Sequence, residues 1–316
     1  MSTGITGLIS RGTIAFRRRF IPFLTFECRV LLGHVSAKQS QRLVDMELAG
    51  KVMQAKPFVR RQGAGPAVFC LHSSLSSSKQ WQPLMDELDG THEVLAPDLY
   101  GYGQSPAWPA KGMLTLADEV DFLLPVINTI AGSVHLVGHS FGAAVALSIA
   151  LQQPERVKSM VIYEPVLFSL LFDSVPTRPG SDEIWRVQAE VRRLVMMKRL
   201  EDAAEHFVDY WSEKGAWQTF PDFRRQSVAE RMPQVVADFE AILTSSLTLR
   251  DYAKLQMPML ILHGKASPVS SRHVASLLAE AIPNARLHGI EKLGHMGPVT
   301  HADEVNRVII EFLRSQ

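Results

Sequence analysis

The run Gly-His-Ser-Phe-Gly at residues 138–142 constrains the fold of this chain more than any other feature. The mostly apolar residues 134–137 precede it and small apolar residues 143–147 follow it, which predicts a strand, a sharp turn and a helix. Glycines on both sides of the serine permit a strained turn that lifts its side chain clear of the sheet edge. Unpaired N–H groups at the start of the helix can stabilise negative charge there. The pattern therefore predicts that Ser140 is a nucleophile.

Strand and helix patterns alternate around this turn. Strands are predicted at residues 67–71, 93–96, 134–137, 160–163, 259–262 and 285–290, and helices at 79–88, 116–130, 143–147, 271–281 and 303–313. Between about residues 166 and 250 the alternation stops, and prolines and glycines separate successive helical patterns. We therefore predict an α/β fold with a mostly parallel central sheet, helices on both faces and a helical cap insertion. The expected parts are an N-terminal extension (1–44), a core (45–165 and 251–316) and a cap (166–250).

Composition excludes several classes of function. The 33 Lys and Arg residues nearly balance the 32 Asp and Glu residues, and no basic patch is interleaved with aromatic residues, so a small-molecule substrate is expected and nucleic acid is not. Two cysteines cannot form a disulfide framework, which favours a reduced, cytoplasmic protein. The 11 histidines show no metal-binding spacing, so no metal and no other cofactor is expected. The oligomeric state stays open.

The N-terminal extension has a different composition. No acidic residue precedes Glu27, and residues 17–21, Arg-Arg-Arg-Phe-Ile, resemble a twin-arginine export motif. Because Glu27 and Arg29 interrupt the apolar segment early, a cytoplasmic location is favoured over export. The extension is otherwise expected to be a helix that docks on the body or an amphipathic surface segment. No stretch reaches the roughly 20 apolar residues that a membrane span needs.

A serine hydroxyl needs a general base, because it is a poor nucleophile near neutral pH. The run Gly-His-Met-Gly-Pro at residues 294–298 follows the last predicted strand, which places His295 at the same sheet edge as Ser140. The chain order of serine before histidine also fits a hydrolase. We therefore predict that His295 is the base, the alternative being a histidine in a surface loop.

A third region, residues 72–78, reads His-Ser-Ser-Leu-Ser-Ser-Ser between a predicted strand and a predicted helix. Backbone N–H groups of such a loop, with that of Phe141, would form an oxyanion hole worth roughly 3 to 4 kcal/mol per donor. The alternative is a flexible serine-rich linker, which the short connections of α/β units disfavour.

These motifs together resemble the α/β-hydrolase superfamily, in its capped, single-domain form. The resemblance runs from about residue 45 to the C-terminus and includes residues 98–105, which match the turn D-x-x-G-x-G-x-S. It implies an esterase, lactonase, cofactor-free haloperoxidase or carbon–carbon bond hydrolase. It further implies that Ser140 is the nucleophile, that His295 is the base, and that the N–H groups of Phe141 and Ser74 are the oxyanion donors.

The chain departs from the family pattern at two places. The family usually carries His-Gly in the oxyanion loop, whereas this chain carries His72-Ser73, which leaves open whether Ser73 or Ser74 donates. After the strand at residues 259–262, relatives usually read Gly-x-x-Asp, and here Ser267 stands at the position of the aspartate.

An imidazole base needs an acceptor on its other nitrogen, so another acid is expected at this sheet edge. Glu164 directly follows the strand at residues 160–163, where pancreatic-type lipases and certain haloalkane dehalogenases, which this arrangement resembles, carry their acid. We predict that Glu164 is the acid, the alternative being that it only caps the loop into the cap. Glu291 and Asp303 are poorer candidates, because they lie close to His295 in sequence and would reach the far side of its ring only awkwardly.

The sequence thus predicts a serine hydrolase that cleaves a small, apolar carboxylic ester or related acyl substrate through an acyl-enzyme intermediate. The alternatives are a lactonase, a carbon–carbon bond hydrolase, or a non-catalytic ligand-binding relative of the same fold. Trp185, Trp211 and Trp217 of the cap are either pocket lining or core, and no individual role is assigned to them.

Overall fold

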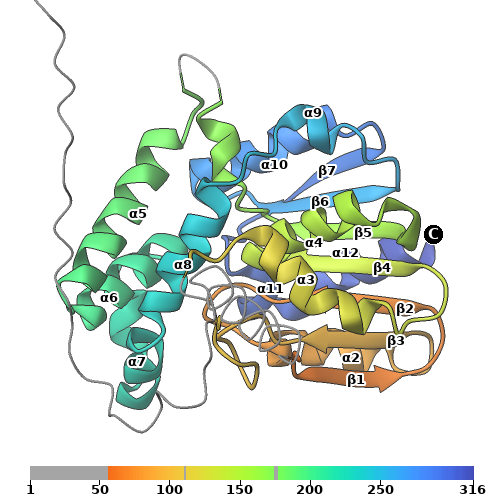
Figure 1. The fold of residues 1–316 in the computed structure, drawn as a ribbon, viewed down its shortest axis with the longest axis horizontal. Helices are drawn as coiled ribbons and strands as arrows, with labels where there is room; N and C mark the ends of the chain where they lie inside the picture. The colour runs from red at the N-terminus through yellow and green to blue at the C-terminus, as the bar shows by residue number, and fades with distance from the viewer. Residues whose placement is uncertain (1–55, 110–111, 174–176) are drawn as a thin grey trace, which may run out of the picture. The chain divides into compact units, whose positions relative to one another are not determined.

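The computed structural model describes residues 56–109, 112–173 and 177–316. The predicted extension over residues 1–44, with its twin-arginine-like segment, lies outside these ranges. Within them, one sheet has the strand order β1-β3-β2-β4-β5-β6-β7 (Figure 1). The strands are β1 Val59–Gly63, β2 Ala67–Leu71, β3 Glu93–Pro97, β4 Val134–His139, β5 Val157–Tyr163, β6 Met259–Gly264 and β7 Ala285–Ile290. All neighbouring pairs are parallel except β1 with β3, so the mostly parallel sheet is confirmed.

Helices pack on both faces of the sheet. The main ones are α2 Gln82–Leu88, α3 Leu116–Ile127, α4 Phe141–Gln152, α10 Val269–Ala281 and α12 Ala302–Arg314. Cys70 of β2 lies in one buried apolar cluster with Leu84 of α2 and Ile309 of α12. Its neighbour Phe69 lies in a second cluster with Leu123 of α3. Successive strand residues therefore point into two separate cores, as the alternation of side chains along a strand requires.

Several element boundaries differ from the sequence prediction, and one strand was not predicted. The predicted helix over 79–88 begins as a 3₁₀ turn, Ser78–Trp81, because the side chain of Ser77 accepts a hydrogen bond from the N–H of Lys79. The predicted helix over 116–130 ends at Ile127. The antiparallel edge strand β1 was not predicted, because its residues Val-Arg-Arg-Gln-Gly are polar and only partly buried.

The segment between β5 and β6 is helical. It contains α5 Ser181–Met196, α6 Leu200–Trp211, α7 Asp222–Ala229, α8 Met232–Leu243 and the short α9 Leu249–Tyr252. Helices α5 to α8 lie beyond the carboxyl ends of the parallel strands, and α8 also contacts α4 (Figure 1). Ten residues of α4, Phe141 to Ala150, are buried because this helix packs against the sheet and against the helical segment.

These helices are short or amphipathic. Across the described residues, none combines the length and the apolar character required to traverse a lipid bilayer.

Candidate active site

Ser140 lies between β4 and α4 in a strained backbone conformation. Its φ is 56° and its ψ is −119°, a region that non-glycine residues rarely adopt. The glycines beside it are required by close backbone approach: a Cβ at Gly142 would lie 2.4 Å from the carbonyl oxygens of Leu71 and His72. A Cβ at Gly138 would lie 2.7 Å from the Cα atom of Ala143. The turn predicted from the Gly-x-Ser-x-Gly run is therefore formed.

Three residues that are distant in sequence meet at this turn. His295, in the loop after β7, has its Nε2 3.0 Å from the Oγ of Ser140. Its Nδ1 lies 2.6 Å from Oε2 of Glu164, the residue that follows β5. All three side chains are buried, and that of Glu164 is 0% exposed. The structure thus brings together Ser140, His295 and Glu164, as a serine–histidine–acid relay requires.

The carboxylate of Glu164 is held by hydrogen bonds on both oxygens. Oε1 accepts from the N–H of Gly264 at 2.8 Å and from the hydroxyl of Ser267, while Oε2 faces His295. Burial alone would raise the pKa of Glu164. The hydrogen bond to His295 and the charge of His295, together with the hydrogen bonds from Ser267 and Gly264, outweigh burial and lower the pKa. Glu164 is therefore ionised near neutral pH. Its backbone has a positive φ of 46°, which is uncommon for a non-glycine residue.

The other acids at this edge have different partners. Glu291 forms an exposed ion pair with Lys265. Asp98 accepts hydrogen bonds from the N–H groups of Ser78 and Gln104, which fixes its own turn. Neither carboxylate is hydrogen-bonded to His295.

In the loop after β2, the N–H groups of Ser73 and Ser74 differ in whether they have an acceptor. The N–H of Ser73 donates to Oε1 of Gln80 at 3.2 Å, and the hydroxyl of Ser73 donates to the same oxygen at 3.1 Å. Within the described ranges, the N–H groups of Ser74 and Phe141 donate no hydrogen bond. Of the two serines left open by the sequence, Ser74 is thus the one whose N–H has no protein acceptor in this part of the chain.

A buried chain of hydrogen bonds links this loop to the loop of His295. Nε2 of Gln80 lies 3.1 Å from Nδ1 of His139, and Nε2 of His139 lies 2.9 Å from the carbonyl oxygen of His295. An amide nitrogen only donates and a carbonyl oxygen only accepts, so His139 carries its proton on Nε2. Burial, followed by the nearby charge of His295, lowers the pKa of His139 well below its ordinary value, so this imidazole stays neutral.

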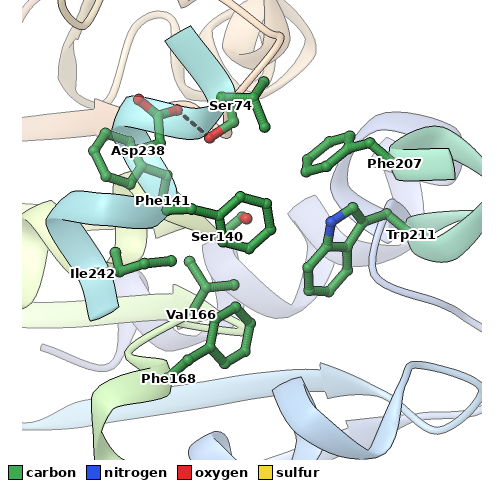
Figure 2. A pocket seen from close by; sticks show the side chains of 11 residues that line it. Ser74, Ser140, Phe141, Val166, Phe168, Phe207, Trp211, Asp238 and Ile242 are labelled. Atoms are coloured by element: carbon green, nitrogen blue, oxygen red, sulfur yellow. Dashed lines mark hydrogen bonds between the residues drawn. The ribbon is translucent and has the colours of Figure 1, made fainter. Parts of the chain in front are cut away.

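Ser140 opens into a small cavity between the sheet and the helical segment. The cavity has about 270 Å³ of empty space. Its lining comes from the loop after β2, the turn at Ser140, the segment after β5, and helices α6 and α8 (Figure 2). The lining residues are Ser74, Ser140, Phe141, Val166, Phe168, Phe207, Trp211, Val235, Asp238, Phe239 and Ile242. Most of them are apolar, and Asp238 is the single ionisable residue among these described lining residues.

Trp211 packs directly on the base. The centroid of its ring lies 4.1 Å from that of His295, with an angle of 36° between the ring planes. Trp211 is 5% exposed and projects from α6 into the cavity wall (Figure 2). The indole ring therefore covers the imidazole and limits its contact with water.

Asp238 and Gln80 were not identified from the sequence. The bond between Asp238 and Ser74 spans 164 positions, and no local pattern marks an aspartate on an amphipathic helix as a cavity residue. Gln80 stands in a predicted helix with no motif around it. In the described ranges, no group of three or more His, Cys, Asp or Glu side chains is arranged to hold a metal ion.

Comparisons with known proteins agree with this architecture. A family model described as "alpha/beta hydrolase fold" matches residues 66–302. The 2-hydroxymuconate semialdehyde hydrolase of Pseudomonas putida is 29% identical over 229 residues, which cover 71% of this chain and 77% of that protein. A pimeloyl-acyl-carrier-protein methyl ester esterase of Aeromonas hydrophila is 28% identical over 265 residues, which cover 81% of this chain and 98% of that protein. Among solved structures, an alpha/beta hydrolase from Sphaerobacter thermophilus matches with a TM-score of 0.63 at 25% identity, covering 81% of this chain and 96% of that one.

Proposed function

The chain belongs to the α/β-hydrolase family and is a hydrolase, and on that premise we propose that it is a serine hydrolase cleaving small, neutral, apolar carboxylic esters. One observation carries the proposal. The two ring nitrogens of His295 are hydrogen-bonded to Ser140 on one side and to an ionised carboxylate, Glu164, on the other. A base held in this way removes the proton of the serine hydroxyl and is stabilised once it becomes positively charged.

The proposed reaction follows from these contacts. The Oγ of Ser140 attacks the ester carbonyl carbon while Nε2 of His295 takes the hydroxyl proton, and Glu164 holds the ring and balances its charge. The N–H groups of Phe141 and Ser74 would donate to the oxyanion of the tetrahedral intermediate. His295 then protonates the departing alcohol, which leaves an acyl group on Ser140. Water, deprotonated by the same imidazole, releases the acid and restores the serine.

The cavity indicates the kind of acyl group. Its enclosed space is far smaller than the roughly 300 to 1,000 Å³ of pockets for drug-sized ligands, so a small acyl group is favoured. Phe168, Phe207 and Ile242 give it apolar walls (Figure 2). The 11 described lining residues include no Arg, Lys or His that would neutralise an anionic substrate. A neutral, apolar acyl group fits this lining.

This lining argues against one alternative function, a carbon–carbon bond hydrolase whose substrate carries a carboxylate. The Pseudomonas putida relative is named for 2-hydroxymuconate semialdehyde, which is itself a carboxylate. A second negative charge beside Asp238 in a buried cavity would be strongly unfavourable without a cation. Methyl ester cleavage, for which the Aeromonas hydrophila relative is named, needs no such cation. A lactone is an ester and would be opened by the same steps.

A fluorophosphonate probe tests the proposal, because it reacts with an activated serine. We expect the wild-type protein to gain one adduct on the peptide that contains Ser140, and we expect Ser140→Ala to gain none. Ser148→Ala is the matched control, since that buried hydroxyl on the same helix bonds only the Ala144 carbonyl, and it should label as the wild type does. Absence of labelling in the wild type, or equal labelling of Ser140→Ala, would overturn the proposal.

A further inference from the structure

Asp238 is a buried carboxyl group in the cavity of Ser140 that the proposed reaction does not use. It lies on α8 and is 2% exposed. Its Oδ2 accepts hydrogen bonds from the hydroxyls of Ser74 at 2.5 Å and Tyr102 at 2.6 Å, and its Oδ1 accepts from Nε2 of Gln234 at 3.0 Å. All three donors are neutral, so none of these partners balances the charge of the carboxylate.

Asp238 lies on the side of the cavity where the ester carbonyl must bind. Ser74 connects the two groups: its hydroxyl donates to Asp238, while its N–H is the proposed oxyanion donor. Figure 2 shows the Asp238–Ser74 pair above Phe141, on the same side of the cavity. An acyl chain whose carbonyl oxygen faces Ser74 therefore places its first carbons close to Asp238.

Asp238 carries a negative charge near neutral pH. Burial raises its pKa to about 6, against the opposing effect of the hydrogen bonds from Ser74, Tyr102 and Gln234. The neighbouring buried acid, Glu119, has its pKa raised well above the ordinary value, by burial first and then by the charge of Asp238. Glu119 thus stays protonated, and Asp238 remains the charged group of the two.

Asp238 also retains capacity for another hydrogen bond. An ionised carboxylate offers about four acceptor positions, and three are occupied here by Ser74, Tyr102 and Gln234. A buried carboxylate with an unfilled acceptor position gains from a ligand that donates to it. A ligand carboxylate has no proton to donate and would meet a like charge in a cavity of low polarity.

We propose that Asp238 determines acyl specificity: it favours acyl groups that carry a hydroxyl group near the ester carbonyl and rejects acyl groups that carry a carboxylate. The inference rests on the proposed function, because the selected molecules are substrates of Ser140. It adds a polar requirement to a cavity that is otherwise apolar. Hydroxyacyl esters are the substrate class that this combination of walls and acceptor fits.

Three methyl esters of equal acyl length test the inference: methyl butyrate, methyl 3-hydroxybutyrate and monomethyl succinate. The reaction is followed by methanol release at pH 8, where Asp238 is ionised. For the wild type we expect kcat/KM to be at least about tenfold higher for the hydroxy ester than for the succinate, with the plain ester between them.

Two variants separate charge from hydrogen bonding. Asp238→Asn removes the charge but keeps an acceptor oxygen. The kcat/KM for monomethyl succinate, divided by that for methyl butyrate, should therefore rise at least about fivefold, while the preference for the hydroxy ester persists in part. Asp238→Leu removes both, so both preferences should disappear. Asp202→Asn is the control, because that half-exposed aspartate on α6 pairs with Arg199 and does not line the cavity, and its ratios should match those of the wild type.

Ratios of kcat/KM between substrates distinguish specificity from folding. Unchanged ratios in Asp238→Asn and Asp238→Leu, even with lower overall activity, would overturn the inference. If a variant fails to fold, the kcat/KM values of the wild type still test the inference. Equal values for the three esters would contradict it, and the order hydroxybutyrate, butyrate, succinate supports it. A wild type that neither labels at Ser140 nor cleaves any ester refutes the proposed function instead.

Discussion

The hydroxyl of Ser267 donates a hydrogen bond to Oε1 of Glu164, the carboxylate whose other oxygen faces His295. By the resemblance of the sequence to the family, Ser267 stands where relatives usually carry an aspartate. The loop after β6 thus still contacts the acid of the proposed relay, although the acid itself comes from the end of β5. The same loop adds a second donor, the N–H of Gly264.

Ser267→Ala is expected to lower kcat for ester cleavage by about tenfold, because it removes a hydrogen bond to a charged, buried group. KM should change little, since Ser267 does not line the cavity. Steady-state kinetics on a methyl ester measure both. Ser271→Ala is the control: its buried hydroxyl bonds the Pro268 carbonyl in the same loop. Equal kcat values for the wild type and Ser267→Ala would show that this bond does not support Glu164.

Gln80→Leu should lower kcat by about tenfold with KM nearly unchanged. The substitution releases the N–H of Ser73 and breaks the link to His139, and loss of buried hydrogen bonds costs about 1 to 3 kcal/mol. A structural defect alone would lower the melting temperature but would not lower kcat selectively while KM stays the same. Gln82→Leu, whose amide bonds only side chains on the surface, is the control. An unchanged kcat in Gln80→Leu would contradict a positioning role for the network.

Trp211→Leu is expected to lower kcat by about 5- to 30-fold, whereas Trp211→Phe should retain most activity. The indole ring covers His295 at 4.1 Å, and an aromatic face that stabilises a desolvated cation is worth about 1 to 2 kcal/mol. Trp185→Leu is the control, because Trp185 is 56% exposed on α5. If Trp211→Phe and Trp211→Leu lose the same activity, the aromatic face is not what matters.

The charge of Asp238 should make stability depend on pH. Its pKa is about 6 in the folded protein and near 3.9 in an unfolded chain, so the folded state binds the proton more tightly. Protonation of Asp238 stabilises the folded state fully below about pH 4, and this stabilisation is lost as the pH rises through about 6. The free energy of unfolding should fall by up to roughly 3 kcal/mol over this range. Urea denaturation from pH 4 to 8 measures it. The free energy of unfolding of Asp238→Asn should lack this dependence on pH. If the free energies of unfolding of the variant and the wild type differ by the same amount at every pH, the predicted pH dependence is wrong.

Local pattern was sufficient for the fold and for part of the site. The run around Ser140 needs only neighbours in sequence, since glycines, a strand and a helix together specify the turn. The position of His295 after the last strand follows from the rule that carboxyl ends of parallel strands share one edge. Glu164 was predicted because the usual acid position held Ser267, and the structure brings Glu164 to His295.

The remaining polar contacts depend on tertiary structure. Asp238 reaches Ser74 only because α8 folds back across the strand ends, an arrangement that amphipathic patterns do not encode. Gln80 bridges two loops through His139, which lies 59 positions away from it in the sequence. The edge strand β1 escaped prediction for another reason: its exposed polar residues lack the apolar alternation of a buried strand.

We propose that the acid of this hydrolase is Glu164, at the end of β5, in place of an acid after β6. The decisive measurement is kcat/KM for ester cleavage in Glu164→Ala and in the double variant Glu164→Ala with Ser267→Asp, which returns a carboxylate to the usual position. We expect kcat/KM of Glu164→Ala to fall by about 10³- to 10⁴-fold and that of the double variant to be at least about tenfold higher than that of Glu164→Ala. Activity of Glu164→Ala within about threefold of the wild type would contradict this proposal, because an orienting carboxylate is worth far more than that.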